Sequence, residues 1–252
     1  MQNYTLRTAY ITIAGILSVA PLSAQEQSKS EFLSLESFYE EELTDTPSIF
    51  DPLESVNRVT FQFNDFVYVN VVDPIATGYR AITPDPVERG AENFFDNLRY
   101  PVRLAGNLLQ GKFEGALKET GRFAVNSTVG IGGIFTPADR FDSLSNIPPE
   151  DIGQALGAWG IGEGPYIVLP LFGPSNLRDI GGFTADRAVN PLKEPFSVID
   201  DWEWQLGLGV TEFVVESPAI LDRYLQLKGS AIDPYSSVKD GYTQYRRRAI
   251  AE

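Results

Sequence analysis

The segment Asp51–Val72, DPLESVNRVTFQFNDFVYVNVV, decides how the chain is read, because its apolar side chains recur with the period of an α-helix. The apolar arc is wider than a surface helix needs. It consists of Leu53, Val56, Thr60, Phe63, Val67 and Val71, widened by Phe61, Phe66, Tyr68 and Val72, with Asn57, Arg58, Asn64, Asp65 and Asn70 elsewhere. Asp51-Pro52 predicts the helix start and Asp73-Pro74 its end. Polar interruptions exclude a transmembrane span, so the aromatic face belongs either to a core or to a membrane interface.

Prolines and glycines place the ends of the other predicted helices. These helices run from Asp85 to about Leu98, from Pro101 to Gly111, from Glu114 to Ser127, from Trp202 to about Val215, from Pro218 to about Lys228 and from Asp233 to Arg248. Strand signals are weak, and Pro170 argues against a central strand in residues 166–174. We therefore predict an all-α, mostly helical single domain.

Residues 130–174 have a different character, because glycine and proline interrupt a nearly uncharged apolar run. Irregular apolar backbone has to be buried in protein or line a cavity, so loops at a channel or groove are expected. The glycines of residues 157–164 lack the Lys-Ser/Thr of a phosphate loop, which favours close turns over nucleotide binding. This region also contains four carboxylates: Asp139, Asp142, Glu150 and Asp151. Their spacing fits no calcium-binding loop, and nothing in the sequence places two of them as an acid/base pair, so we predict a solvated loop.

The N-terminal residues predict export. Residues 1–24 resemble a signal peptide, with an apolar run from about Ala9 to Ala20 and a small-residue context for cleavage before Gln25. An uncleaved anchor is the weaker alternative, because the run is short for a bilayer. Residues 25–50 form an acidic leader, read as a solvated spacer in preference to a short amphipathic helix. Residues 51–248 then form the helical domain.

Composition narrows the function further. The chain contains no Cys and no His, which excludes disulfides, Ser-His and Cys-His nucleophile pairs, and zinc sites built on these ligands. No catalytic residue, metal or cofactor is therefore predicted. A net charge of −14 disfavours nucleic acid and anionic membrane surfaces, so any membrane contact has to be apolar.

Five segments occur in an informative order: DPLESVNR at 51–58, NFFDNL at 93–98, GIGGIF at 130–135, GEGPY at 162–166 and RDIGG at 178–182. Over roughly residues 50–245 they resemble the MlaA (VacJ) family of outer-membrane phospholipid-transport lipoproteins. The resemblance implies a mostly helical ring embedded in the periplasmic leaflet of the outer membrane. It also implies an amphipathic channel that removes misplaced outer-leaflet phospholipids, with a periplasmic lipid carrier and a trimeric porin as partners.

The resemblance also supplies candidate site residues. Asn64 and Phe66 match the family's first amphipathic helix, which influences channel gating. The apolar glycine segment matches a segment beside the channel, which makes these residues the predicted lipid path: Gly130, Gly132, Gly133, Ile134 and Phe135. Arg178, beside Asp179, is read as a buried structural pair, with contact to a lipid head group as the alternative.

One feature departs from the family. Gln25 stands where a lipoprotein carries its acylated Cys. Membrane residence would then depend on the apolar surface and on porin contacts. A soluble periplasmic lipid-binding or scaffold protein is the alternative function, and a carboxylate-dependent hydrolase is a distant third.

Overall fold

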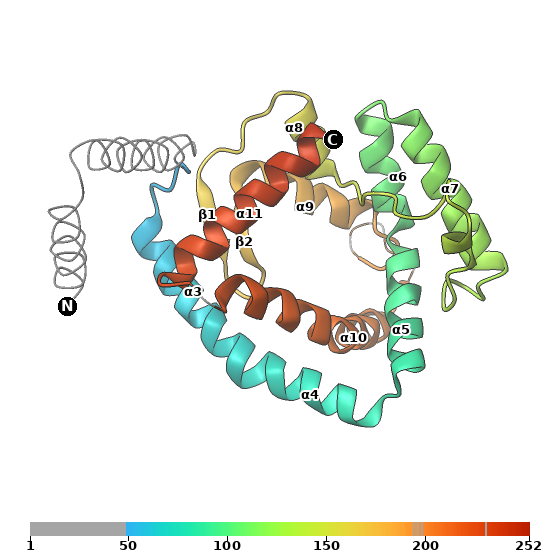
Figure 1. Ribbon diagram of the computed structural model, residues 1–252, viewed down its shortest axis with the longest axis horizontal. Coiled ribbons are helices and arrows are strands. Elements are labelled where there is room, and N and C mark those ends of the chain that lie inside the picture. The colour runs from blue at the N-terminus through green and yellow to red at the C-terminus, as the bar shows by residue number, and fades with distance from the viewer. Residues whose placement is uncertain (1–48, 194, 196, 198, 230) are drawn as a thin grey trace, which may run out of the picture. The chain divides into compact units, whose positions relative to one another are not determined.

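A computed structural model describes residues 49–193, 195, 197, 199–229 and 231–252 (Figure 1). The predicted signal peptide and all but the last two residues of the predicted acidic leader lie outside this range. The described elements are α3 (Glu54–Val67), η1 (Tyr68–Val72), α4 (Asp73–Ile82), α5 (Asp85–Leu98), α6 (Tyr100–Leu109), α7 (Phe113–Thr128), η2 (Pro137–Arg140), α8 (Ile152–Ala158), β1 (Tyr166–Leu169), β2 (Gly173–Asn176), α9 (Leu177–Val189), α10 (Trp202–Lys228) and α11 (Pro234–Ala251).

Within residues 49–252 these elements form a closed circuit (Figure 1). The chain runs from α3 through η1 and α4 into α5 and α6, and α6 packs on α8 and α9. Both α8 and β2 contact α9 and α11, β2 pairs with β1, and β1 packs on α3 where the circuit began. The long helix α10 lies along α4 and also contacts α5 and α11. The predicted ring of helices is confirmed.

The prediction that Asp73-Pro74 ends the first helix is wrong. Residues 54–82 stay helical throughout, because the π-helical turn η1 ends at Val72 and α4 begins directly after it, with Pro74 as its second residue. Wider i→i+5 turns relieve the chain where a regular α-helical bond is lost, and Pro74 itself lies in the first turn of α4, where its missing N–H is not needed. The predicted cap is also wrong: α3 begins at Glu54, and the Asp51 carboxylate instead accepts hydrogen bonds from Asn57 and Tyr235.

The prediction of two helices separated by Pro218 is wrong for a similar reason. A single helix, α10, runs through Pro218. Proline has no N–H for the carbonyl four residues earlier, which is that of Val214. The Ser217 hydroxyl donates to this carbonyl oxygen at 2.7 Å and replaces the missing bond.

Regular structure also occurs where irregular backbone was expected. Tyr166–Leu169 and Gly173–Asn176 form an antiparallel hairpin, with Pro170 in its turn and not in a strand. The short helix α8 begins at Ile152, and the Asp151 carboxylate caps it by accepting from the Gln154 N–H at 2.7 Å. The predicted bounds of α5, α6 and α7 agree with the structure to within a residue or two.

Close backbone contacts hold the circuit together where α8 meets its neighbours. A Cβ atom placed on Gly182 would lie 2.4 Å from the Gly153 Cα, and one on Gly106 would lie 2.8 Å from the Asp151 backbone nitrogen. Buried apolar side chains form only small clusters among the described residues, Val72 with Ala76 and Leu221, and Tyr166 with Val168 and Tyr235. Backbone proximity and polar contacts therefore carry much of the packing.

Candidate functional site

The apolar face of α3 points outward. Val56, Val59, Phe63 and Phe66 are between 49% and 67% exposed. Other elements of the ring also expose apolar side chains: Ile82 and Val87 at α4 and α5, Leu108, Leu109, Phe113 and Leu117 on α6 and α7, and Trp159 beyond α8. Exposed apolar side chains that gather on one face, as those of α3 do, mark a surface that contacts lipid or another protein. No helix among the described residues is long and apolar enough to cross a membrane.

The polar face of α3 points inward and binds the hairpin. Asn57 donates to the Tyr166 carbonyl oxygen at 3.0 Å and accepts from the Val168 N–H at 2.9 Å. About two helical turns further along the same face, Asn64 donates to the Leu169 carbonyl oxygen at 2.9 Å and accepts from the Leu171 N–H at 2.7 Å. Both asparagines are 2% exposed. Their amides thus replace a neighbouring strand along the free edge of β1, which would otherwise carry unpaired backbone groups.

The two predicted lipid-path residues of α3 lie on different faces. Asn64 is buried against the hairpin, whereas Phe66 is exposed on the outer surface. Asn64 also positions the hairpin tip, where Leu171 adopts a left-handed φ of 69° and Phe172 packs on Phe183 with ring centroids 5.5 Å apart. Leu171 and Phe172 are both exposed, so this tip presents apolar side chains from a strained backbone.

The predicted segment from Gly130 to Phe135 forms one tight turn at the end of α7. The Phe135 N–H donates to the Gly130 carbonyl oxygen at 2.9 Å, and the Gly133 N–H donates to the Asn126 carbonyl oxygen at 2.9 Å. Glycine is required at 133, where φ is 94° and a Cβ would lie 2.4 Å from the Asn97 Cβ.

Asparagines of α5 fix this turn in place. Asn97 donates to the Gly132 carbonyl oxygen at 3.3 Å, and Asn93 donates to the Ile134 carbonyl oxygen at 3.2 Å. The turn therefore displays exposed Ile131, Ile134 and Phe135 from a rigid base. Their contact with lipid stays a prediction.

A buried ionic junction joins α8, α9 and α11. Arg246 donates from Nε to Asp179 Oδ2 at 2.8 Å, and its other nitrogens donate to Asp151 at 2.6 and 3.0 Å. Tyr242 also donates to Asp179, at 2.6 Å. Arg178 is buried in the same junction and donates from Nε to Asp179 Oδ1 at 2.9 Å. The structural pair expected for Arg178 and Asp179 is thus present, and a head-group contact for Arg178 stays a prediction.

The pKa values of Asp179 and Asp186, both on α9, are shifted in opposite directions. Burial alone would raise the pKa of Asp179, but hydrogen bonds from Arg178, Arg246 and Tyr242 outweigh it and lower that pKa. Burial raises the pKa of Asp186 to about 6, and the positive charge of Arg246, which acts in the opposite direction, is too weak to reverse this. Its Oδ1 accepts from the Ile152 N–H at 3.0 Å, at the start of α8.

The sequence analysis did not identify Arg246 as a site residue. The one available signal was the spacing of Tyr242 and Arg246, which places them on the same face of α11.

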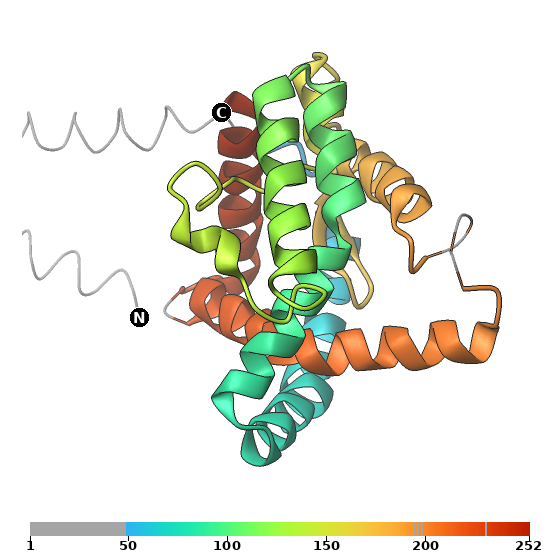
Figure 2. The ribbon, with the colours of Figure 1, turned by 90° about the vertical axis from the view of Figure 1, so that its right-hand side faces the viewer.

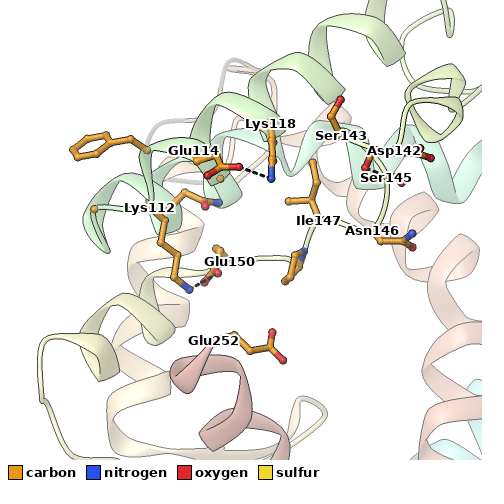
Figure 3. Close-up of a pocket in the computed structure, with 15 residues that line it drawn as sticks. Lys112, Glu114, Lys118, Asp142, Ser143, Ser145, Asn146, Ile147, Glu150 and Glu252 are labelled. Carbon is orange, nitrogen blue, oxygen red and sulfur yellow. Dashed lines mark hydrogen bonds and ion pairs between the residues drawn. The ribbon is translucent and has the colours of Figure 1, made fainter.

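The loop from Asp139 to Asp151 is only partly solvated, which corrects the prediction. Asp139 and Asp142 are exposed, but Glu150 is buried and accepts from Lys112 Nζ at 2.7 Å and from Gln110 Nε2 at 2.6 Å. These contacts border a pocket of about 640 Å³. Figure 3 shows Lys112 directed at Glu150 on one side of the pocket, and Ser143, Ser145 and Asn146 on the other. Its cations are engaged, since Lys118 also pairs with Glu114 at 2.7 Å.

Comparison with known proteins agrees with this architecture. The family model described as MlaA lipoprotein matches residues 49–249. A protein of Shigella flexneri named "Intermembrane phospholipid transport system lipoprotein MlaA" is 34% identical over 204 residues, covering 80% of this chain and 78% of that protein. An uncharacterised protein of Rickettsia prowazekii is 30% identical over 210 residues, with the same coverage. A solved structure described as "Structural basis for maintenance of bacterial outer membrane lipid asymmetry" has a TM-score of 0.66 and 32% identity, covering 79% of this chain and 98% of that chain.

Proposed function

The chain belongs to the MlaA lipoprotein family, and from this premise we propose that it is the outer-membrane component of an intermembrane phospholipid transport system. In this role it removes mislocalised phospholipids from the outer leaflet and so maintains lipid asymmetry. The observation that carries the proposal is the reversed polarity of α3, with its apolar face exposed and its asparagines buried. Such a helix suits a surface that contacts acyl chains.

Lipid transfer needs binding and release but no covalent chemistry. The absence of Cys and His in the sequence fits this requirement, because the usual nucleophile–base pairs cannot form. We expect the lipid to pass through an amphipathic channel in the ring and to reach a periplasmic carrier protein. A trimeric porin is the expected partner within the membrane.

Anchoring in the membrane would differ from that of a lipoprotein. Without a Cys at position 25, no acyl chain can be attached at a mature N-terminus generated by cleavage there. The exposed apolar surface then has to hold the protein in the periplasmic leaflet after signal-dependent export. The alternative is a soluble periplasmic lipid-binding or scaffold protein that has lost its anchor.

Fractionation of cells that produce the chain, with Gln25→Cys as the matched variant, separates these readings. The proposal predicts outer-membrane recovery of the unchanged protein, extraction only by detergent, and phospholipid in the purified sample. Labelling of outer-leaflet phosphatidylethanolamine with an impermeant amine reagent should decrease when the protein is produced in cells lacking their own family member. Lipid-free recovery in the soluble periplasm, with membrane recovery only for Gln25→Cys, would favour the scaffold reading.

A further inference from the structure

A second cavity lies where α9 ends and α10 begins, away from the ionic junction. It has a volume of about 450 Å³. The first half of α10 extends beyond the helices beside it (Figure 2), and this half forms one wall of the cavity. Arg187, in the last turn of α9, and Lys193 also line the cavity.

The α10 wall is mainly apolar, with the polar side chain of Gln205 also lining it. Trp202, Leu206, Val210 and Phe213 follow one another at helical spacing along one face, and all four are exposed. Neither Gly207 nor Gly209 has a heavy atom within 4 Å of where its Cβ would lie, so other described residues do not cover the helix at these two positions. An uncovered aromatic and aliphatic wall of this kind suits an acyl chain.

The rim carries one uncompensated positive charge. Lys193 is paired with Glu212, which also accepts from Arg99. Arg187 is exposed, and among the described residues its guanidinium has no ion-pair or hydrogen-bond partner. Arg178, in contrast, is buried and bound to Asp179. Of these two arginines, Arg187 is therefore the one whose guanidinium group is free to donate two hydrogen bonds to the oxygens of a phosphate.

We infer that this cavity binds one glycerophospholipid, with its phosphodiester on Arg187 and an acyl chain along the Trp202–Phe213 face of α10. The volume suits a head group, the glycerol and the first carbons of a chain, and the rest of the lipid lies on the exposed helix. The inference rests on the proposed function and adds to it a location and a head-group ligand on this chain.

Tryptophan quenching tests the inference directly. Trp159→Phe with Trp204→Phe leaves Trp202 as the only tryptophan, beside the proposed acyl chain. Phosphatidylglycerol brominated on its acyl chains should quench this tryptophan in the full chain held in detergent. Arg187→Ala should raise the apparent Kd about tenfold, because a charge-assisted phosphate contact is lost. Arg187→Lys should restore part of the affinity, since it keeps the charge without the fork.

Two controls isolate the phosphate contact. Arg140→Ala removes another exposed arginine, on η2, and should leave quenching unchanged. Brominated diacylglycerol, which has the chains without the phosphate, should quench equally in the parent and in Arg187→Ala. Equal affinity of the parent and Arg187→Ala for the phospholipid would overturn the inference, as would an equal loss in Arg140→Ala.

The same samples separate this inference from the proposed function. If phospholipid copurifies with the parent protein and Arg187→Ala binds it with unchanged affinity, the inference about Arg187 is wrong but the proposed function stands. A parent protein that neither carries phospholipid nor is quenched by the brominated lipid removes the proposed function as well.

Discussion

The outer face of α3 is apolar although it is exposed, whereas the junction of α8, α9 and α11 is charged although it is buried. A water-soluble protein usually has the reverse arrangement. The α3 face exposes valine and phenylalanine, whereas the junction buries Arg246 with Asp151 and Asp179. Where the surroundings are apolar, moving an apolar side chain inward gains little free energy. Directional hydrogen bonds, ion pairs and close glycine contacts then have to specify the fold. The comparison predicts that polar changes inside disrupt the fold and that changes on the outer face do not.

Removal of Arg246 should have the largest effect on folding. Arg246→Ala leaves Asp151 and Asp179 without their shared cation, and breaking a buried ion network typically costs about 3–5 kcal/mol. The free energy of unfolding in detergent measures the loss. Arg248→Ala is the matched control, because Arg248 is exposed on the same helix and should change stability by less than about 0.5 kcal/mol. Equal stability of the two variants would contradict the role given to the junction.

The asparagine contacts should come next. Asn64→Ala leaves the Leu169 carbonyl and the Leu171 N–H without their partner, at a cost of about 1–3 kcal/mol for two partly buried hydrogen bonds. Local hydrogen exchange of the Leu171 amide should increase along with the drop in unfolding free energy. Asn70→Ala, which removes an exposed asparagine from η1, should change neither quantity. An unprotected Leu171 amide in the parent protein would show that the strand edge is not held by Asn64.

Asp186 should give a pH-dependent effect of smaller size. Its folded pKa of about 6 lies above the ordinary aspartate pKa of 3.8, so between these pH values the folded protein keeps a proton that the unfolded chain has lost. Stability therefore falls as the pH rises from 4 to 6. Asp186→Asn cannot ionise and still accepts from the Ile152 N–H, so above pH 6 it should be more stable than the parent by about 1–3 kcal/mol. Unfolding curves at pH 4 and pH 7.5 measure this difference, and an equal difference at both values would exclude the assignment.

The outer face should give the smallest effect on folding. Phe66→Ser removes an exposed ring, so the unfolding free energy in detergent should change by less than about 0.5 kcal/mol. Partition into liposomes should weaken by about 1.5–3 kcal/mol, because the ring leaves the lipid. Co-sedimentation with liposomes measures the partition. A strong loss of stability with unchanged partition would mean that Phe66 belongs to a core.

Local signals made much of the helical architecture predictable. Asp85-Pro86 and Asp233-Pro234 mark helix starts, and Gly111, with a left-handed φ of 72°, follows α6 as expected. Pro74 and Pro218 misled the prediction because their missing bonds are relieved by a π-helical turn and by the Ser217 hydroxyl. Neither compensation follows from helix propensity.

The site was less predictable, because its contacts join distant residues. Asn64 binds Leu169, which lies 105 positions away, and Arg246 binds Asp179 at a separation of 67. Helical periodicity separates the two faces of α3 but does not say which one points inward. Each strand of the hairpin has only four residues, which is too short to be predicted from its own sequence pattern. The edge of the hairpin is completed by Asn57 and Asn64, which are distant in sequence.

Single-cysteine spin labelling tests the central claim that the outer face of α3 contacts lipid. The chain contains no Cys, so a label introduced at Val59 or Phe66 reports from one position, and a label at the exposed loop residue Asp142 serves as the control. In phospholipid vesicles, the labels at Val59 and Phe66 should be relaxed strongly by oxygen and weakly by a water-soluble nickel chelate, with the reverse at Asp142. Strong relaxation by the nickel chelate at Val59 and Phe66 would place this face in water and contradict the account.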